Sequence, residues 1–193
     1  MTDGRLPFRV LFVCVGNTCR SPMAEQLLRA RLENEQWVEV DSAGILAEVG
    51  SPMTTEASDA LIAHVGTIAQ HRAKQLTEAM VAAADLVLAA TRDIRADIVR
   101  SVPNAVRRTF TVREFARLAA LMPDDAVPAL SGLAAAVAAE RVGAPDADDD
   151  VADPIGKPAR DYVLAADVLN DAVTVIARAL QKAWRATSLR DSD

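Results

Sequence analysis

Cysteine, histidine and aromatic side chains are scarce in this chain, which has two cysteines, two histidines and 4% aromatic residues. Cys14 and Cys19 alone do not make the disulfide framework of a small secreted domain, and we expect both to remain thiols in a reducing compartment. Together with two distant histidines they also lack the ligand spacing of a zinc site. We therefore expect neither a metal ion nor a cofactor.

A basic excess and a membrane-length apolar run are also lacking. The formal net charge is −6, which argues against a protein that binds nucleic acids or membrane surfaces. No apolar run approaches the ~20 residues that a membrane span needs, and residues 1–7 are polar, unlike a signal peptide. We expect a cytoplasmic protein that binds neither nucleic acid nor membranes.

Strand-like and helix-like patterns alternate along the 193 residues, which are enough for one domain with a full hydrophobic core. The predicted strands span 9–13, 37–40, 85–90 and 107–112. The predicted helices follow Ser21, span 54–65, run from a Thr77 cap to 84, follow a Thr91 cap, and run from about 158 to 186. This alternation predicts an α/β domain over residues 9–186, with a parallel sheet covered by helices on both faces and with tails at 1–8 and 187–193.

Residues 119–150 interrupt the alternation. They are rich in Ala, Pro and Asp, include a helical stretch at 130–140, and end in the acidic run 145–150. We interpret the segment as an inserted, hairpin-like excursion that ends in a mobile, solvated acidic linker. A metal site is the weaker interpretation of the acidic run, because the alternating oxygen ligands and turn glycine of a calcium loop are missing.

The most informative segment joins the first predicted strand to the first predicted helix. It reads Cys14-Val15-Gly16-Asn17-Thr18-Cys19-Arg20-Ser21-Pro22. Ligands of parallel α/β sheets bind beyond the carboxyl ends of the strands, at helix N-termini, and this segment lies at such a place. The sequence G-x-x-x-x-G-K-[ST] is missing, so this is no nucleotide-binding P-loop.

A thiolate at the floor of a phosphate-binding loop is the chemistry that these nine residues predict. Successive backbone N–H groups and the dipole of the following helix favour an anion. Arg20 adds a planar cation that can hold two phosphate oxygens, and Ser21 can cap the helix and donate a hydrogen bond to the sulfur. The expected nucleophile is Cys14. The expected phosphate-binding residues are Val15, Gly16, Asn17, Thr18, Cys19 and Arg20. The plainer alternative is a buried strand-end cysteine in an ordinary turn.

The same nine residues resemble the signature loop of the low-molecular-weight protein tyrosine phosphatase family, which includes a bacterial protein arginine phosphatase branch. Further along, Asp41–Gly44 resembles the end of the family's second strand, His71–Gln75 its histidine-containing segment, and Asp153-Pro154 its general-acid motif. The resemblance covers most of the chain except the excursion and the tails. It implies a three-layer sandwich whose central four-stranded parallel sheet has the strand order 2-1-3-4.

The resemblance also implies a mechanism. Cys14 attacks phosphorus to form a phosphocysteine, Arg20 binds the phosphoryl oxygens, and Asp153 protonates the leaving group and then activates water. A thiolate suits both displacements, because it is a nucleophile and a leaving group. The acidic residues 148–150 are expected to repel the negative form of Asp153 and so favour its protonation. The alternative for Asp153 is an ordinary residue at the start of the last helix.

Supporting roles follow from the resemblance as well. Ser42 and His71 are expected to hold Asn17 and so fix the loop, although a lone histidine is more often structural. Cys19 is expected to be a reversible oxidation partner of Cys14, and the alternative is a small residue that fits the loop.

The substrate is a phosphorylated protein, and two residues bear on its class. Family members that act on phosphotyrosine usually carry aromatic residues after Asp-Pro, where this chain has Ile155, and Thr18 resembles the arginine phosphatase branch. Leu46 and Ile155 can still provide an apolar pocket wall beside Thr18. We therefore predict a phosphotyrosine phosphatase first and an arginine phosphatase second.

Two other functions are weaker. An arsenate reductase of this fold needs cysteines downstream of Cys19, and the chain has none. A non-catalytic phosphate-binding domain would be favoured by the loss of Cys14 or Asp153, and both are present. A monomer or weak homodimer is expected.

Overall fold

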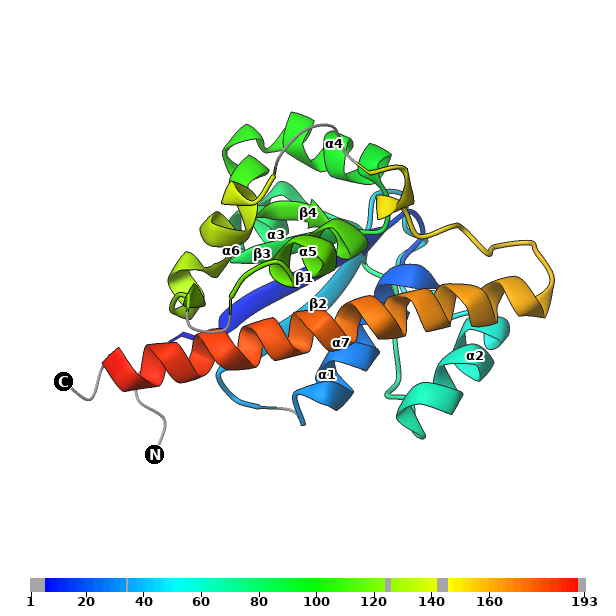
Figure 1. Ribbon diagram of the computed structural model, residues 1–193. Helices are drawn as coiled ribbons and strands as arrows, with labels where there is room; N and C mark the ends of the chain where they lie inside the picture. Colours follow the sequence, from blue (N-terminus) through cyan, green and yellow to red (C-terminus); the bar gives the residue numbers. More distant parts are fainter. Residues whose placement is uncertain (1–5, 34, 124–125, 142–145, 191–193) are drawn as a thin grey trace.

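The computed structural model describes residues 6–33, 35–123, 126–141 and 146–190. Four parallel strands form one sheet in the order β2-β1-β3-β4. They are β1 (Phe8–Cys14), β2 (Val38–Gly44), β3 (Leu86–Ala89) and β4 (Thr109–Thr111). Helices cover both faces of the sheet (Figure 1). The predicted three-layer fold and its strand order are confirmed.

The helices surround this sheet in chain order. They are α1 (Arg20–Arg31), α2 (Thr55–Val65), α3 (Glu78–Ala83), α4 (Arg92–Ser101), the 3₁₀ segment η1 (Pro103–Arg108), α5 (Val112–Ala119), α6 (Leu130–Ala139), the 3₁₀ segment η3 (Ala147–Asp149) and α7 (Ala159–Arg190). Thr77 and Thr91 cap α3 and α4 as predicted, each accepting a hydrogen bond from a backbone N–H in the first helical turn. None of the described helices is both long and apolar enough to cross a membrane.

Side chains of β1 alternate between two cores, because successive residues of a strand point to opposite faces. Val10 and Phe12 belong to the larger core, which residues of α1, α2, α5, α6 and α7 complete. Leu11 and Val13 belong to the smaller core, which residues of α3 and α4 complete. Burial on both faces explains why the strand is nearly continuously apolar.

The observed boundaries correct three predictions. The fourth strand is shorter than 107–112, because η1 extends to Arg108 and Thr111 already caps α5. The last helix continues past residue 186 to Arg190, and β1 begins at Phe8, so residues 187–190 and 8 are not tails. Residues 1–5, 191–193 and 142–145 lie outside the described part of the chain.

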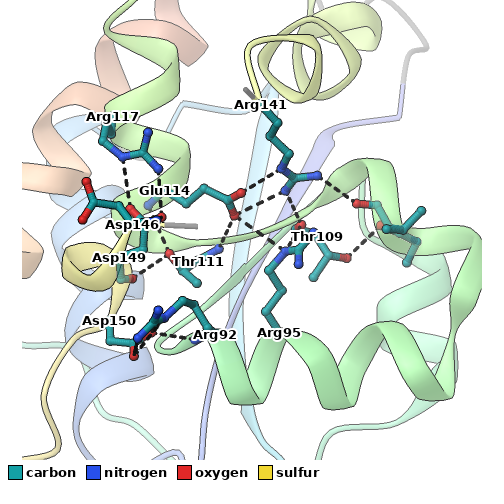
Figure 2. A network of polar contacts seen from close by, with 12 residues as sticks. Arg92, Arg95, Thr109, Thr111, Glu114, Arg117, Arg141, Asp146, Asp149 and Asp150 are labelled. Carbon is teal, nitrogen blue, oxygen red and sulfur yellow. Dashed lines mark hydrogen bonds and ion pairs between the residues drawn. The ribbon is translucent and has the colours of Figure 1, made fainter. Parts of the chain in front are cut away.

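The excursion is packed against the domain. Leu130, Leu133 and Val137 of the predicted helix are buried in the larger core. The prediction of a solvated acidic linker is wrong for Asp149 and Asp150, which both pair with arginines of the domain (Figure 2). Those arginines come from α4 and α5, and their proximity arises only from the tertiary fold.

Candidate active site

The nine-residue motif connects β1 to α1. Cys14 is the last residue of β1, and α1 already begins at Arg20. Ser21 is therefore the second residue of the helix, and the prediction that it caps the helix is wrong: Cys19 takes the N-cap position without a side-chain hydrogen bond. Because the helix starts early, the Ser21 hydroxyl can turn back toward the sulfur.

The Cys14 sulfur is buried and lies among hydrogen-bond donors. The Asn17 backbone N–H donates to Sγ at 3.2 Å, and Ser21 Oγ lies 2.9 Å from Sγ. Asn17 Nδ2 donates to the same Ser21 oxygen at 2.9 Å, which leaves the Ser21 proton free to be donated. Its other nearby acceptor, the Ala43 carbonyl, is 3.4 Å away. Two donors directed at one sulfur favour a thiolate there.

Asn17 is the centre of the loop. It is fully buried and adopts the left-handed conformation with φ of 55°, which asparagine tolerates better than most residues. Its Nδ2 also donates to Ser42 Oγ at 2.8 Å, and its Oδ1 accepts from the Lys74 backbone N–H at 2.8 Å. Its carbonyl oxygen lies 2.7 Å from His71 Nε2. The structure thus brings Ser42 and His71 to the residue that they were expected to hold.

Two residues that sequence reasoning missed support this arrangement. Glu25, buried in α1, accepts a hydrogen bond from Ser42 Oγ at 2.5 Å and pairs with Arg29 at 2.9 Å. Gly44 ends β2 beside the loop, where an added Cβ would lie 2.4 Å from the Val15 carbonyl oxygen. The spacing of Glu25 and Arg29 on a helix was visible in the sequence, but the burial of Glu25 was not.

Arg20 links the loop to the predicted acid. Its guanidinium is 4% exposed, and its Nη1 donates to the Val151 carbonyl at 3.1 Å. Its Nη2 lies 2.5 Å from Asp153 Oδ2. The side chain of Asp153 is 45% exposed, so it contacts both the buried arginine and solvent. Residues 133 positions apart in the sequence therefore meet at the loop.

Asp153 begins a tight turn. Its Oδ1 accepts from the Ile155 backbone N–H at 3.2 Å, and the Lys157 N–H donates to the Pro154 carbonyl at 2.9 Å. Gly156, at the third position of this turn, has φ of 74°, a conformation that glycine adopts without strain. Tyr162 of α7 is buried below the turn, where burial raises the pKa of its hydroxyl and a hydrogen bond to the Gly156 backbone acts in the opposite direction.

The predicted pocket residues lie at the rim of the loop. The backbone of Thr18, which is half-buried, accepts from the Thr54 N–H at 3.0 Å. The Leu46 N–H donates to the Val15 carbonyl at 2.9 Å, and the Leu46 side chain is 74% exposed. Ile155 follows the acid and is 49% exposed. The rim thus carries exposed aliphatic side chains.

Cys19 differs from Cys14 in its surroundings. Burial, together with the nearby Cys14 charge, raises the pKa of Cys19 to about 12. Cys19 is therefore a neutral thiol at physiological pH, and the structure favours Cys14 as the nucleophile.

A parallel α/β fold, a cysteine in a strand-to-helix loop, and an arginine and an aspartate beside it define the class of cysteine-dependent phosphatases. The chain belongs to the low molecular weight phosphotyrosine protein phosphatase family, whose sequence profile matches residues 9–123. Enzymes of this family are hydrolases of phosphate monoesters. The matched range ends four residues after α5, within the excursion.

Similar proteins include both branches of the family. The protein-arginine-phosphatase of Geobacillus stearothermophilus is 36% identical over 178 residues, 91% of this chain and 98% of that protein. The solved YwlE arginine phosphatase from the same organism has a TM-score of 0.70 and 35% identity, with 91% and 94% of the two chains covered. The low molecular weight protein tyrosine phosphatase from T. tengcongensis has a TM-score of 0.67 and 33% identity, with 89% and 98% covered.

Proposed function

We propose that this protein hydrolyses phosphotyrosine in proteins through a phosphocysteine on Cys14. The observation that carries the proposal is the meeting of three groups at one loop. The Cys14 sulfur accepts two hydrogen bonds there, and Arg20 contacts Asp153 beside it. A nucleophile, a phosphate-binding cation and a proton donor are the groups that a two-step displacement requires.

In the first step, the Cys14 thiolate attacks phosphorus while the bond to the leaving oxygen breaks. Arg20 and the N–H groups of residues 15–20 bind the phosphoryl oxygens, where charge must be stabilised. Asp153 transfers its proton to the leaving oxygen. The phosphoryl group replaces Asp153 as the partner of Arg20, which frees the carboxyl group to face the leaving group.

In the second step, the Asp153 carboxylate takes a proton from a water molecule that attacks phosphorus. The bond between sulfur and phosphorus breaks, and phosphate is released. The departing Cys14 thiolate is stabilised by Ser21 and by the Asn17 N–H. One residue thus acts as acid and then as base, which is consistent with its partial exposure.

Phosphoarginine is a second candidate substrate, and the comparisons strengthen it. The relative named a protein-arginine-phosphatase matches nearly the whole chain. Thr18 places a hydroxyl in the loop, and Ile155 stands where an aromatic pocket wall would be expected. With this substrate the same displacement breaks a phosphorus–nitrogen bond, and Asp153 delivers its proton to the guanidine nitrogen.

One comparison distinguishes the two substrates. The turnover of phosphotyrosine and phosphoarginine peptides should be measured for the wild type and for Thr18→Ile, with the exposed Thr67→Ile as a control. Turnover of phosphotyrosine by both proteins supports the first candidate. A wild-type preference for phosphoarginine that disappears in Thr18→Ile, but not in Thr67→Ile, contradicts it and establishes the second.

The proposal also covers the protein's organisation and setting. We propose a single catalytic domain over about residues 9–186, acting in the cytoplasm as a monomer or weak homodimer, without a metal ion or cofactor. The net charge of −6 supports a protein that binds neither nucleic acid nor membranes. Cys19 is proposed to attack an oxidised Cys14 and so form a reversible disulfide.

A further inference from the structure

We propose that Arg92 and Arg117 are positioning residues for Asp153: through Asp150 and Asp149 they fix the chain that leads into the acid-bearing turn. The inference rests on the proposed function, since it assumes that Asp153 donates a proton. The acidic residues were expected to act on Asp153 by repulsion. In the structure Asp149 and Asp150 each have their own arginine, so their charges are compensated (Figure 2).

Asp150 is held by the first residue of α4. Arg92 Nε lies 3.2 Å from both carboxylate oxygens, and Nη2 lies 3.0 Å from Oδ2. The Arg92 backbone N–H donates to Oδ1 at 2.7 Å, so the carboxylate also occupies the positive end of the helix. Burial alone would raise the pKa of Asp150, but the hydrogen bonds and charge of Arg92 outweigh it and lower the pKa.

Asp149 is held more deeply by α5. Its side chain is 3% exposed, and Arg117 donates to it through Nε at 3.2 Å and Nη2 at 2.8 Å. The Asp149 carbonyl accepts from Thr111 Oγ1 at 2.7 Å. Thr111 caps α5, so the segment is fixed to the point where β4 becomes α5.

The backbone contacts that follow carry this position to the active site. The Arg113 guanidinium donates to the Asp150 carbonyl at 3.3 Å, and the Val151 N–H donates to the Ala90 carbonyl, just past β3, at 2.8 Å. The Val151 carbonyl accepts from Arg20 at 3.1 Å. Asp153 is two residues further on. The segment before Asp153 is therefore anchored to α4, α5 and the end of β3 in succession.

Few contacts hold Asp153 itself. Its other side is a short turn that the Tyr162 hydroxyl contacts at Gly156, and the chain then crosses to α7 as an extended segment (Figure 1). A displacement at Asp150 would thus pass to Asp153 across only three positions. Proton transfer depends on the acid being within hydrogen-bond reach of the leaving atom, so a small displacement should slow this step selectively.

The test uses the wild-type chain and the variants Arg92→Met, Asp150→Asn and Arg100→Met. Arg100→Met is the matched control, because Arg100 lies on α4 and forms an exposed ion pair with Asp97 of the same helix. The readout is kcat/KM for p-nitrophenyl phosphate divided by kcat/KM for phenyl phosphate, whose poorer leaving group needs the proton.

We expect Arg92→Met and Asp150→Asn to raise this ratio by roughly tenfold through kcat, with KM unchanged. Arg100→Met should keep the wild-type ratio, and Arg92→Lys should restore part of it. An equal loss on both esters, or an unchanged ratio in Asp150→Asn, overturns the inference. Asp153→Asn separates the two claims: if it raises the ratio while the Arg92 and Asp150 variants do not, only the positioning role fails, whereas an unchanged ratio in Asp153→Asn removes the proposed acid itself.

Discussion

The nucleophile and the acid are held in opposite ways. Cys14 lies on a buried loop whose central residue, Asn17, is fully buried and hydrogen-bonded through its backbone and side chain. Asp153 is 45% exposed, and its carboxyl contacts only Arg20 and its own turn. The contrast matches the two tasks, since the sulfur must meet phosphorus at a fixed point whereas the acid must exchange protons with a leaving group and then with water.

Removing the nucleophile should have the largest effect. In Cys14→Ser the hydroxyl is a much weaker nucleophile, so the turnover of an aryl phosphate should fall by at least on the order of 10⁴-fold. The loop and Arg20 remain, so binding of inorganic phosphate should stay measurable by calorimetry. Steady-state kinetics on p-nitrophenyl phosphate provides the check, and wild-type turnover by the variant would refute the assignment of Cys14.

Removing the acid should have the next largest effect, and only on demanding substrates. Asp153→Ala should slow phenyl phosphate turnover by on the order of 10²–10³-fold, because no group then protonates the leaving oxygen. Formation of the intermediate from p-nitrophenyl phosphate should be affected much less. Single-turnover rates for both esters measure this, and equal losses would place the acid elsewhere.

Displacing the buried loop tests the other side of the contrast. In Gly44→Ala the new methyl group meets the Val15 carbonyl, which must move away from it. We expect turnover to fall by about 10²-fold on both esters alike. Gly132→Ala in α6 is the control, because its Cβ would make an ordinary contact with Pro128 at 3.4 Å. Wild-type kinetics in Gly44→Ala would show that the loop is less rigidly supported than proposed.

The parts of this comparison differ in how far the sequence reveals them. The loop is a contiguous motif between an apolar run and a helical pattern, and local caps such as Thr77 and Thr91 follow from local rules, so these features could be predicted. The Ser21 prediction failed because one turn of helix register decides whether a serine caps or faces a sulfur. The partners of Asp149 and Asp150 lie 32 and 58 positions away. Only the tertiary fold brings such pairs together.

Cys19 provides the smallest expected effect. Its pKa is raised by burial to about 12, so folding favours the neutral thiol. The sign follows: the contribution to stability is complete below the ordinary value of 9.0 and is lost as pH rises from about 9 toward 12. At pH 10 the wild type should lose about 1 kcal/mol of unfolding free energy relative to Cys19→Ala, compared with pH 8. Urea unfolding of both proteins measures this, and a constant difference would contradict it.

The central claim is that phosphate passes through Cys14, and trapping the intermediate tests it most directly. Asp153→Ala should be mixed with p-nitrophenyl phosphate, whose leaving group needs little protonation, and quenched during the first turnover. Because the base for the second step is then missing, a phosphorylated enzyme should accumulate. Peptide mass mapping should find the phosphoryl group on Cys14. A phosphoryl group on any other residue, or continued hydrolysis by an enzyme that never becomes phosphorylated, would contradict the account.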